Sequence, residues 1–137
     1  MDNQIVIEVS VEAVIDKVWQ YWTVPEFITQ WNFASDDWCC PSAENDLSEG
    51  GHFSWRMEAK SGDIGFDFSG TYDVIVPEKL IRYTLDDGRK VSIEFISDGG
   101  STQVIESFEP ESMNPAEMQK TGWQMILNNF KKLVETS

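Results

Sequence analysis

The chain has 137 residues, of which 41% are hydrophobic and 25% charged, a balance typical of a folded globular protein. Its 24 acidic residues outnumber its 10 basic ones, and the formal net charge of −14 argues against nucleic acid and anionic membrane surfaces, which both select basic patches. No segment is long and apolar enough to be expected to span a membrane, and we expect a single domain over residues 1–137.

The N-terminal region is predicted to form one strand followed by two short helices. Ile5, Ile7 and Val9 alternate with more polar residues, as in a strand, and Ser10 is expected to cap the helix VEAVIDKVWQYW. Pro25 suits the first turn of a second helix, PEFITQW. Because the first residues lack the basic and apolar regions of a signal peptide, we expect a cytoplasmic protein.

The acidic stretch NFASDDWCCPSAENDLSEGG is predicted to be mostly loop, with at most a short edge strand in its middle. It contains two adjacent cysteines, Cys39 and Cys40, which we expect to be reduced in the cytoplasm. Ordinary packing cysteines are the simpler interpretation, and a redox role for the pair is the alternative.

From His52 onward the hydrophobic pattern has a period of two, which predicts strands joined by short turns such as Asp87-Gly88 and therefore an antiparallel sheet. In GFDFSGTYDVIV, the apolar face is expected to run from Phe66 to Val76. In TQVIESFEP, alternation places Glu106 on the apolar face of its strand.

The last segment is predicted to be a long amphipathic helix from about residue 115 to about residue 135. Asn114 is expected to be its cap, Pro115 its first residue and Glu117 its capping-box carboxylate. A strongly twisted sheet around one long helix leaves a gap between the two surfaces, because neither is flat. Gly122 interrupts the helix, either for close packing or to make room for a ligand.

Three parts of the sequence resemble the family of activators of heat-shock-protein (90 kDa) ATPase homologues, in the START-like, or polyketide-cyclase-like (SRPBCC), superfamily. They are VWQYWTVPEFITQWN, the central segments GGHFSWRMEA and FDFSGTYDVIVPEKLIRYTLDDGRKV, and the tail FEPESMNPAEMQKTGWQMILNNFKKLVE. The resemblance implies an α+β helix-grip (START-like, Bet v 1-like) fold, with a curved antiparallel sheet around the C-terminal helix and a hydrophobic cavity between them. It implies no single reaction, since members of the superfamily bind lipids, sterols, hormones or polyketides and a few are enzymes.

The sequence offers few residues for catalysis. His52 is the only histidine and is expected at the surface, and we find no nucleophile elbow, phosphate-binding loop or convincing zinc ligand set. We therefore expect no cofactor and no metal. Glu106 is the most informative single residue, because a buried carboxylate must find a partner or take up a proton. It could orient a ligand or act as a general acid or base; a local bulge or pairing with an arginine is the alternative.

We therefore expect a protein that binds a small hydrophobic or amphipathic molecule, lipid-like or aromatic, between the sheet and the last helix. Tyr72, Glu106 and Gln119 are the groups expected to orient it. One alternative is a co-chaperone-like interaction module that stimulates a heat-shock chaperone ATPase; another is a cyclase or hydrolase that uses the cavity carboxylate. The full set of expected ligand contacts is Trp31, Trp55, Phe66, Phe68, Tyr72, Tyr83, Phe95, Glu106, Gln119, Gly122, Trp123 and Ile126.

Overall fold

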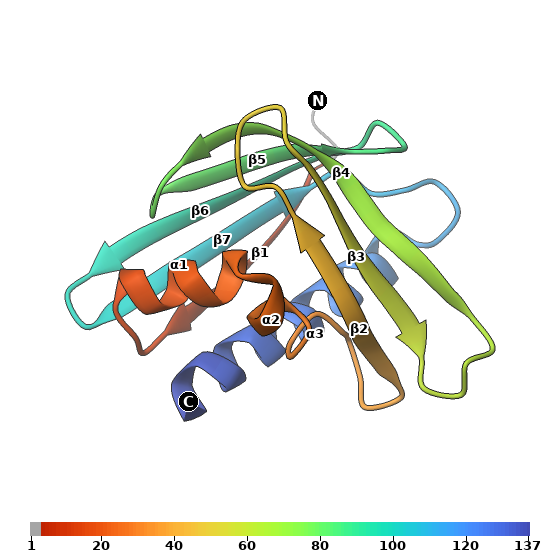
Figure 1. Ribbon diagram of the computed structural model, residues 1–137, viewed down its shortest axis with the longest axis horizontal. Helices are drawn as coiled ribbons and strands as arrows, with labels where there is room; N and C mark the ends of the chain where they lie inside the picture. The colour runs from red at the N-terminus through yellow and green to blue at the C-terminus, as the bar shows by residue number, and fades with distance from the viewer. Residues whose placement is uncertain (1–3) are drawn as a thin grey trace.

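A curved sheet of seven antiparallel strands faces one long helix in the computed structural model, which describes residues 4–137 (Figure 1). The elements in chain order are β1 (Ile5–Val11), α1 (Ile15–Thr23), α2 (Pro25–Ile28), β2 (Trp38–Asn45), β3 (His52–Ala59), β4 (Gly65–Val76), β5 (Leu80–Leu85), β6 (Lys90–Asp98), β7 (Ser101–Phe108) and α3 (Ala116–Thr136). This is the predicted α+β helix-grip architecture.

The strand order β1-β7-β6-β5-β4-β3-β2 shows that β2 to β7 form a meander and that β1 completes the sheet beside β7. The sheet curls around α3, while α1 and α2 lie near one end of the helix (Figure 1). Within residues 4–137, no helix has the length and apolar character needed to cross a membrane.

The core lies between the inward face of the sheet and the apolar side of α3. On α3, Leu127, Phe130 and Val134 are buried at three- and four-residue spacing, as expected for one helix face. On β7, buried and half-buried residues alternate strictly, and Glu106 is among the buried ones. The predicted period of two in this strand, and the inward position of its carboxylate, are therefore confirmed.

Two of the predicted helix caps are wrong. Ser10 lies within β1, paired with Gln103 of β7, and α1 begins only at Ile15. The ladder with β7 satisfies the backbone of this segment, so the chain stays extended beyond the serine. Asn114 also lies outside its helix: α3 begins at Ala116, and the Asn114 side chain instead donates to the Glu111 carboxylate at 3.0 Å.

Two strand assignments also differ from the prediction. β2 is a full edge strand of eight residues in the region expected to be mostly loop. In β4 the register shifts between Tyr72 and Val74, so the inward face continues with Ile75 rather than with Val76, which is 40% exposed. A bulge adds one residue to a strand and reverses the alternation beyond it, and the hydrophobic pattern alone did not reveal it.

Cys39 and Cys40 are free thiols in β2, with Cys40 buried and Cys39 partly exposed. Burial raises the pKa of the Cys40 thiol, and a hydrogen bond from Asn32 opposes that effect. A buried thiol with a raised pKa is a poor nucleophile at neutral pH. This environment favours the packing role over the redox role.

Candidate ligand-binding cavity

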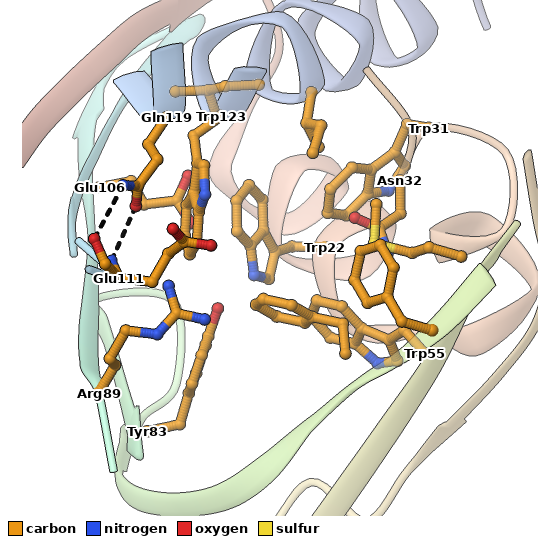
Figure 2. A pocket seen from close by; sticks show the side chains of 15 residues that line it. Trp22, Trp31, Asn32, Trp55, Tyr83, Arg89, Glu106, Glu111, Gln119 and Trp123 are labelled. Carbon is orange, nitrogen blue, oxygen red and sulfur yellow. Dashed lines mark hydrogen bonds between the residues drawn. The ribbon is translucent and has the colours of Figure 1, made fainter. Parts of the chain in front are cut away.

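A cavity of about 380 Å³ lies between the inward face of the sheet and α3 (Figure 2). Its walls come from two helices, four strands and three connecting segments that are distant in the sequence. The lining residues are Trp22, Trp31, Asn32, Trp55, Met57, Phe66, Phe68, Tyr83, Arg89, Glu106, Glu111, Gln119, Trp123, Ile126 and Leu127.

One end of the cavity is aromatic. The Trp31 ring lies 4.9 Å from the ring of Trp22 and 6.5 Å from that of Trp55. The Trp31 indole is fixed because its Nε1 donates to the backbone oxygen of Tyr21 at 2.9 Å. The Trp55 Nε1 is buried without a hydrogen-bond partner in the described residues. The Trp22 and Trp31 rings are tilted by 35°, and those of Trp31 and Trp55 pack edge to face at 71°, so the three indoles form an apolar wall.

The other end of the cavity is polar. Figure 2 shows Tyr83, Arg89, Glu106, Glu111 and Gln119 grouped there, with Trp22 between this group and the Trp31 and Trp55 indoles. Polar groups gathered at one end of an apolar cavity are typical of sites that orient a small molecule.

Glu106 is the buried carboxyl group of the polar end. Its neighbours across the sheet are Ile7 on β1 and Ile93 on β6, so its carboxyl group emerges from an apolar surface and its residue is 6% exposed. Loss of hydration raises its pKa to about 8, and no hydrogen bond or ion pair from the described residues 4–137 opposes this. Glu106 therefore carries a proton in most molecules at pH 7.

The neighbouring charged groups are already engaged. Arg89 Nε lies 2.8 Å from Asp87 Oδ2, in the turn that precedes β6. The Glu111 carboxylate accepts hydrogen bonds from the backbone nitrogens of Met113 and Asn114 at 3.0 and 2.8 Å. Their charges are thus partly satisfied within their own loops, unlike that of Glu106.

Gln119 ties the start of α3 to the loop that follows β7. Its Oε1 accepts from Glu111 N at 2.8 Å, and its Nε2 donates to the backbone oxygens of Glu111 and Asn114 at 3.0 and 2.8 Å. The amide is fully used in these contacts, so Gln119 holds the polar wall in place and has little capacity left to hydrogen-bond a ligand.

The structure brings most of the expected ligand contacts to this cavity but leaves out Tyr72, Phe95 and Gly122. Tyr72 is buried, with its hydroxyl donating to Asn45 Oδ1. Phe95 packs edge-on against Trp19 and Trp22 of α1, at 5.4 and 5.8 Å between ring centroids. The sequence did not reveal that Tyr72 and Phe95 lie in the core away from the cavity, because all inward-facing aromatics share the same alternation.

The sequence analysis missed several lining residues. Trp22 lies in the first predicted helix, VEAVIDKVWQYW, and only the placement of that helix decides whether Trp22 meets a cavity. Arg89 and Glu111 lie in connections, and no periodicity marks the direction of a loop side chain. Asn32, Met57 and Leu127 complete this group.

Gly122 lies on α3 with open space beside it: a Cβ there would meet no atom within 4 Å outside its own helical surroundings. The expectation of close packing at this glycine is wrong. We expect Gly122→Ala to raise the free energy of unfolding by about 0.5–1 kcal/mol, because alanine favours a helix over glycine. Chemical denaturation measures this, and a destabilised variant would show that the glycine is required.

The curled sheet, the single long helix across it and the aromatic cavity between them define a helix-grip cavity protein. The chain belongs to the family described as Activator of Hsp90 ATPase homolog 1-like protein, whose family model matches residues 12–135. No match was found among curated proteins.

Solved structures with the same fold include two with substantial sequence identity. An AHSA1-like protein from Aeromonas hydrophila is 41% identical with a TM-score of 0.91, and the match covers 97% of this chain and 92% of that one. A protein from Cytophaga hutchinsonii is 50% identical with a TM-score of 0.85, covering 98% and 94%. A protein from Chromobacterium violaceum is 24% identical with a TM-score of 0.87, covering 98% and 99%, and supports the fold alone.

Within residues 4–137, no group of three or more His, Cys, Asp or Glu side chains is placed to hold a metal ion. His52 is exposed on β3, with its Nε2 3.7 Å from Asp86 Oδ1, and does not line the cavity.

Proposed function

We propose that this protein binds a small hydrophobic or amphipathic molecule in the cavity between the sheet and α3. The observation that carries the proposal is the cavity itself, about 380 Å³ with an aromatic end and a polar end. Small-molecule sites are typically roughly 300–1,000 Å³ in volume. Burial of apolar ligand surface would supply about 25 cal/mol per Å², less the costs of immobilising the ligand. The pair of free thiols supports a cytoplasmic setting for this function.

The first test is native mass spectrometry of protein purified from its own host, followed by solvent extraction of bound molecules. We expect one apolar or amphipathic compound to co-purify at close to one molecule per chain. Its chemical identity would define the ligand class. Recovery of a stoichiometric protein partner with no small molecule would contradict the proposal.

Filling the cavity gives a second test. Ile126 lines the cavity from α3, whereas the adjacent Met125 is 42% exposed and does not. We expect Ile126→Trp to occupy ligand space and weaken binding at least about tenfold, with Met125→Trp as the matched control that leaves affinity unchanged. Thermal melting should show both variants folded, and equal affinities would place the ligand elsewhere.

A second candidate is a co-chaperone-like interaction module, supported by the name of the family, which refers to an activator of a chaperone ATPase. The net charge of −14 would steer such a domain towards a basic surface. Stimulation of a heat-shock chaperone ATPase by the purified protein tests this candidate. Stimulation that persists in the Ile126→Trp variant would favour an external surface over the cavity.

A further inference from the structure

Glu106 is a buried carboxyl group that forms no ion pair with any side chain of residues 4–137. The groups that face it are Tyr83 from β5, Arg89 from the turn before β6, Glu111 from the loop after β7, and Gln119 and Trp123 from α3. None of the three nitrogen-bearing side chains, Arg89, Gln119 and Trp123, forms a hydrogen bond or ion pair with it in the described part of the chain. A site that leaves a carboxyl group open towards a cavity has room for a partner carried by the ligand.

The charges around the cavity favour a positive partner. Arg89 forms an ion pair with Asp87, whereas Glu111 and an ionised Glu106 add two negative charges at the polar end. The whole chain carries −14 and would also concentrate cations near the cavity. The local negative charge and the net charge of the chain would both repel an anionic ligand.

The cavity walls provide a second feature that suits a cation. The indoles of Trp22, Trp31, Trp55 and Trp123 all line this one space. Tryptophan faces attract organic cations more strongly than other aromatic rings do, and the attraction increases when the cation is desolvated. A carboxylate at one end with several indoles beside it is a site for a charged group attached to an apolar body.

We propose that the ligand is an organic monocation, a protonated or quaternary amine on an apolar body, whose charge lies between the Glu106 carboxylate and the indoles. This inference rests on the proposed function, since it names the class of molecule that the cavity binds. It requires Glu106 to be ionised in the complex, so a proton must leave the carboxyl group when the cation binds.

This proton release fixes the sign of the pH dependence. Because burial raises the pKa of Glu106 to about 8, the free protein holds the proton below that pH. Binding a permanent cation therefore strengthens as pH rises from 6 towards 8, by about tenfold per pH unit at the lower end of this range. If the protonated acid instead donated a hydrogen bond to a neutral or anionic ligand, affinity would fall as pH rises through 8.

The test uses two probes of nearly the same shape, benzyltrimethylammonium and its neutral isostere neopentylbenzene. Neither probe titrates, so any pH dependence belongs to the protein. Titration calorimetry or tryptophan fluorescence between pH 6 and pH 8.5 gives both dissociation constants. We expect the cation to bind at least about tenfold more tightly than the isostere at pH 8, and its affinity to fall with decreasing pH.

Two variants, Glu106→Gln and Glu94→Gln, distinguish the effect of the cavity carboxylate on cation binding from the effect of the overall charge. Glu94 is exposed on β6, so its substitution removes the same formal charge away from the cavity. We expect Glu106→Gln to reduce cation binding at pH 8 at least about tenfold, to abolish its pH dependence and to leave the isostere unaffected. Glu94→Gln should behave like the wild type.

Equal or tighter binding of the neutral isostere, or cation binding that does not depend on pH, would overturn the cation proposal while leaving the ligand-binding function intact. Failure of both probes to bind would count against the cation proposal and the proposed function together. Circular dichroism of the Glu106→Gln variant establishes that a loss of cation binding does not reflect unfolding.

Discussion

Phe130→Ala is expected to lower the free energy of unfolding by about 3–5 kcal/mol. Phe130 is 0% exposed on α3, and its ring meets Trp22 and Trp31 edge-on at 4.9 and 5.0 Å. Truncation would leave a hole beneath the helix that these rigid indoles cannot close. Because folded domains are stable by only about 5–15 kcal/mol, this single change would remove a large part of the total.

Urea denaturation of the variant measures this loss. Met125→Ala is the matched control on the same helix, since Met125 is 42% exposed, and we expect it to change stability by less than about 0.5 kcal/mol. A loss below about 1 kcal/mol for Phe130→Ala would mean that α3 packs much less tightly on the sheet than the structure indicates.

Replacing Glu106 with glutamine is expected to stabilise the protein increasingly as pH rises. The pKa of Glu106 is raised from a usual value near 4.5 to about 8, so the folded state holds a proton that the unfolded state has released. Between these values the wild type loses about 1.4 kcal/mol per pH unit relative to the variant, whose amide does not titrate. Below pH 4.5 both states are protonated and this contribution is fully present; above about pH 8 it is lost.

The measurement is the difference in unfolding free energy between Glu106→Gln and the wild type at pH 4.5, 6 and 8. We expect the difference to increase by several kcal/mol over this range, because each pH unit contributes about 1.4 kcal/mol. Glu94→Gln, exposed on β6, should show little trend. A constant difference would mean that Glu106 keeps an ordinary pKa and that solvent or an ion reaches it in the folded protein.

The raised pKa of Glu106 and its position at the cavity link folding to binding. An acidic side chain between Ile7 and Ile93 weakens the fold at neutral pH compared with an uncharged one. Groups that reduce stability in this way concentrate at functional sites, where stability is exchanged for binding or chemistry. A bound cation would restore the missing counter-charge, so ligand addition should stabilise the wild type more than Glu106→Gln.

Much of the fold follows from local patterns in the sequence. The period of two from His52 to Phe108 and the period of 3.6 on the last helix specify antiparallel strands and one covering helix. Alternation along β7 also placed Glu106 on the inner face, as the structure shows. These predictions succeeded because each depends on the direction of a side chain relative to its own strand or helix.

The wrong predictions for β1 and β4 arose where hydrogen bonding to another strand overrides the local sequence pattern. β1 extends through Ser10 because β7 offers it a continuous ladder, and the bulge in β4 turns Ile75 inward against the predicted pattern. Neither effect is encoded in a short window, since each depends on hydrogen bonds to another strand.

The sequence by itself determined the class of fold, the covering helix and the inward position of one carboxyl group. Only the tertiary structure decided that Glu106 has no ion-pair partner among the described residues, because Arg89 is held by Asp87 and Gln119 by the loop around Glu111. It also decided which inward-facing aromatics line a cavity and which fill the core, as the contrast between Trp31 and Phe95 shows. Burial and charge pairing are set by the distances between elements, and those distances exist only in the folded chain.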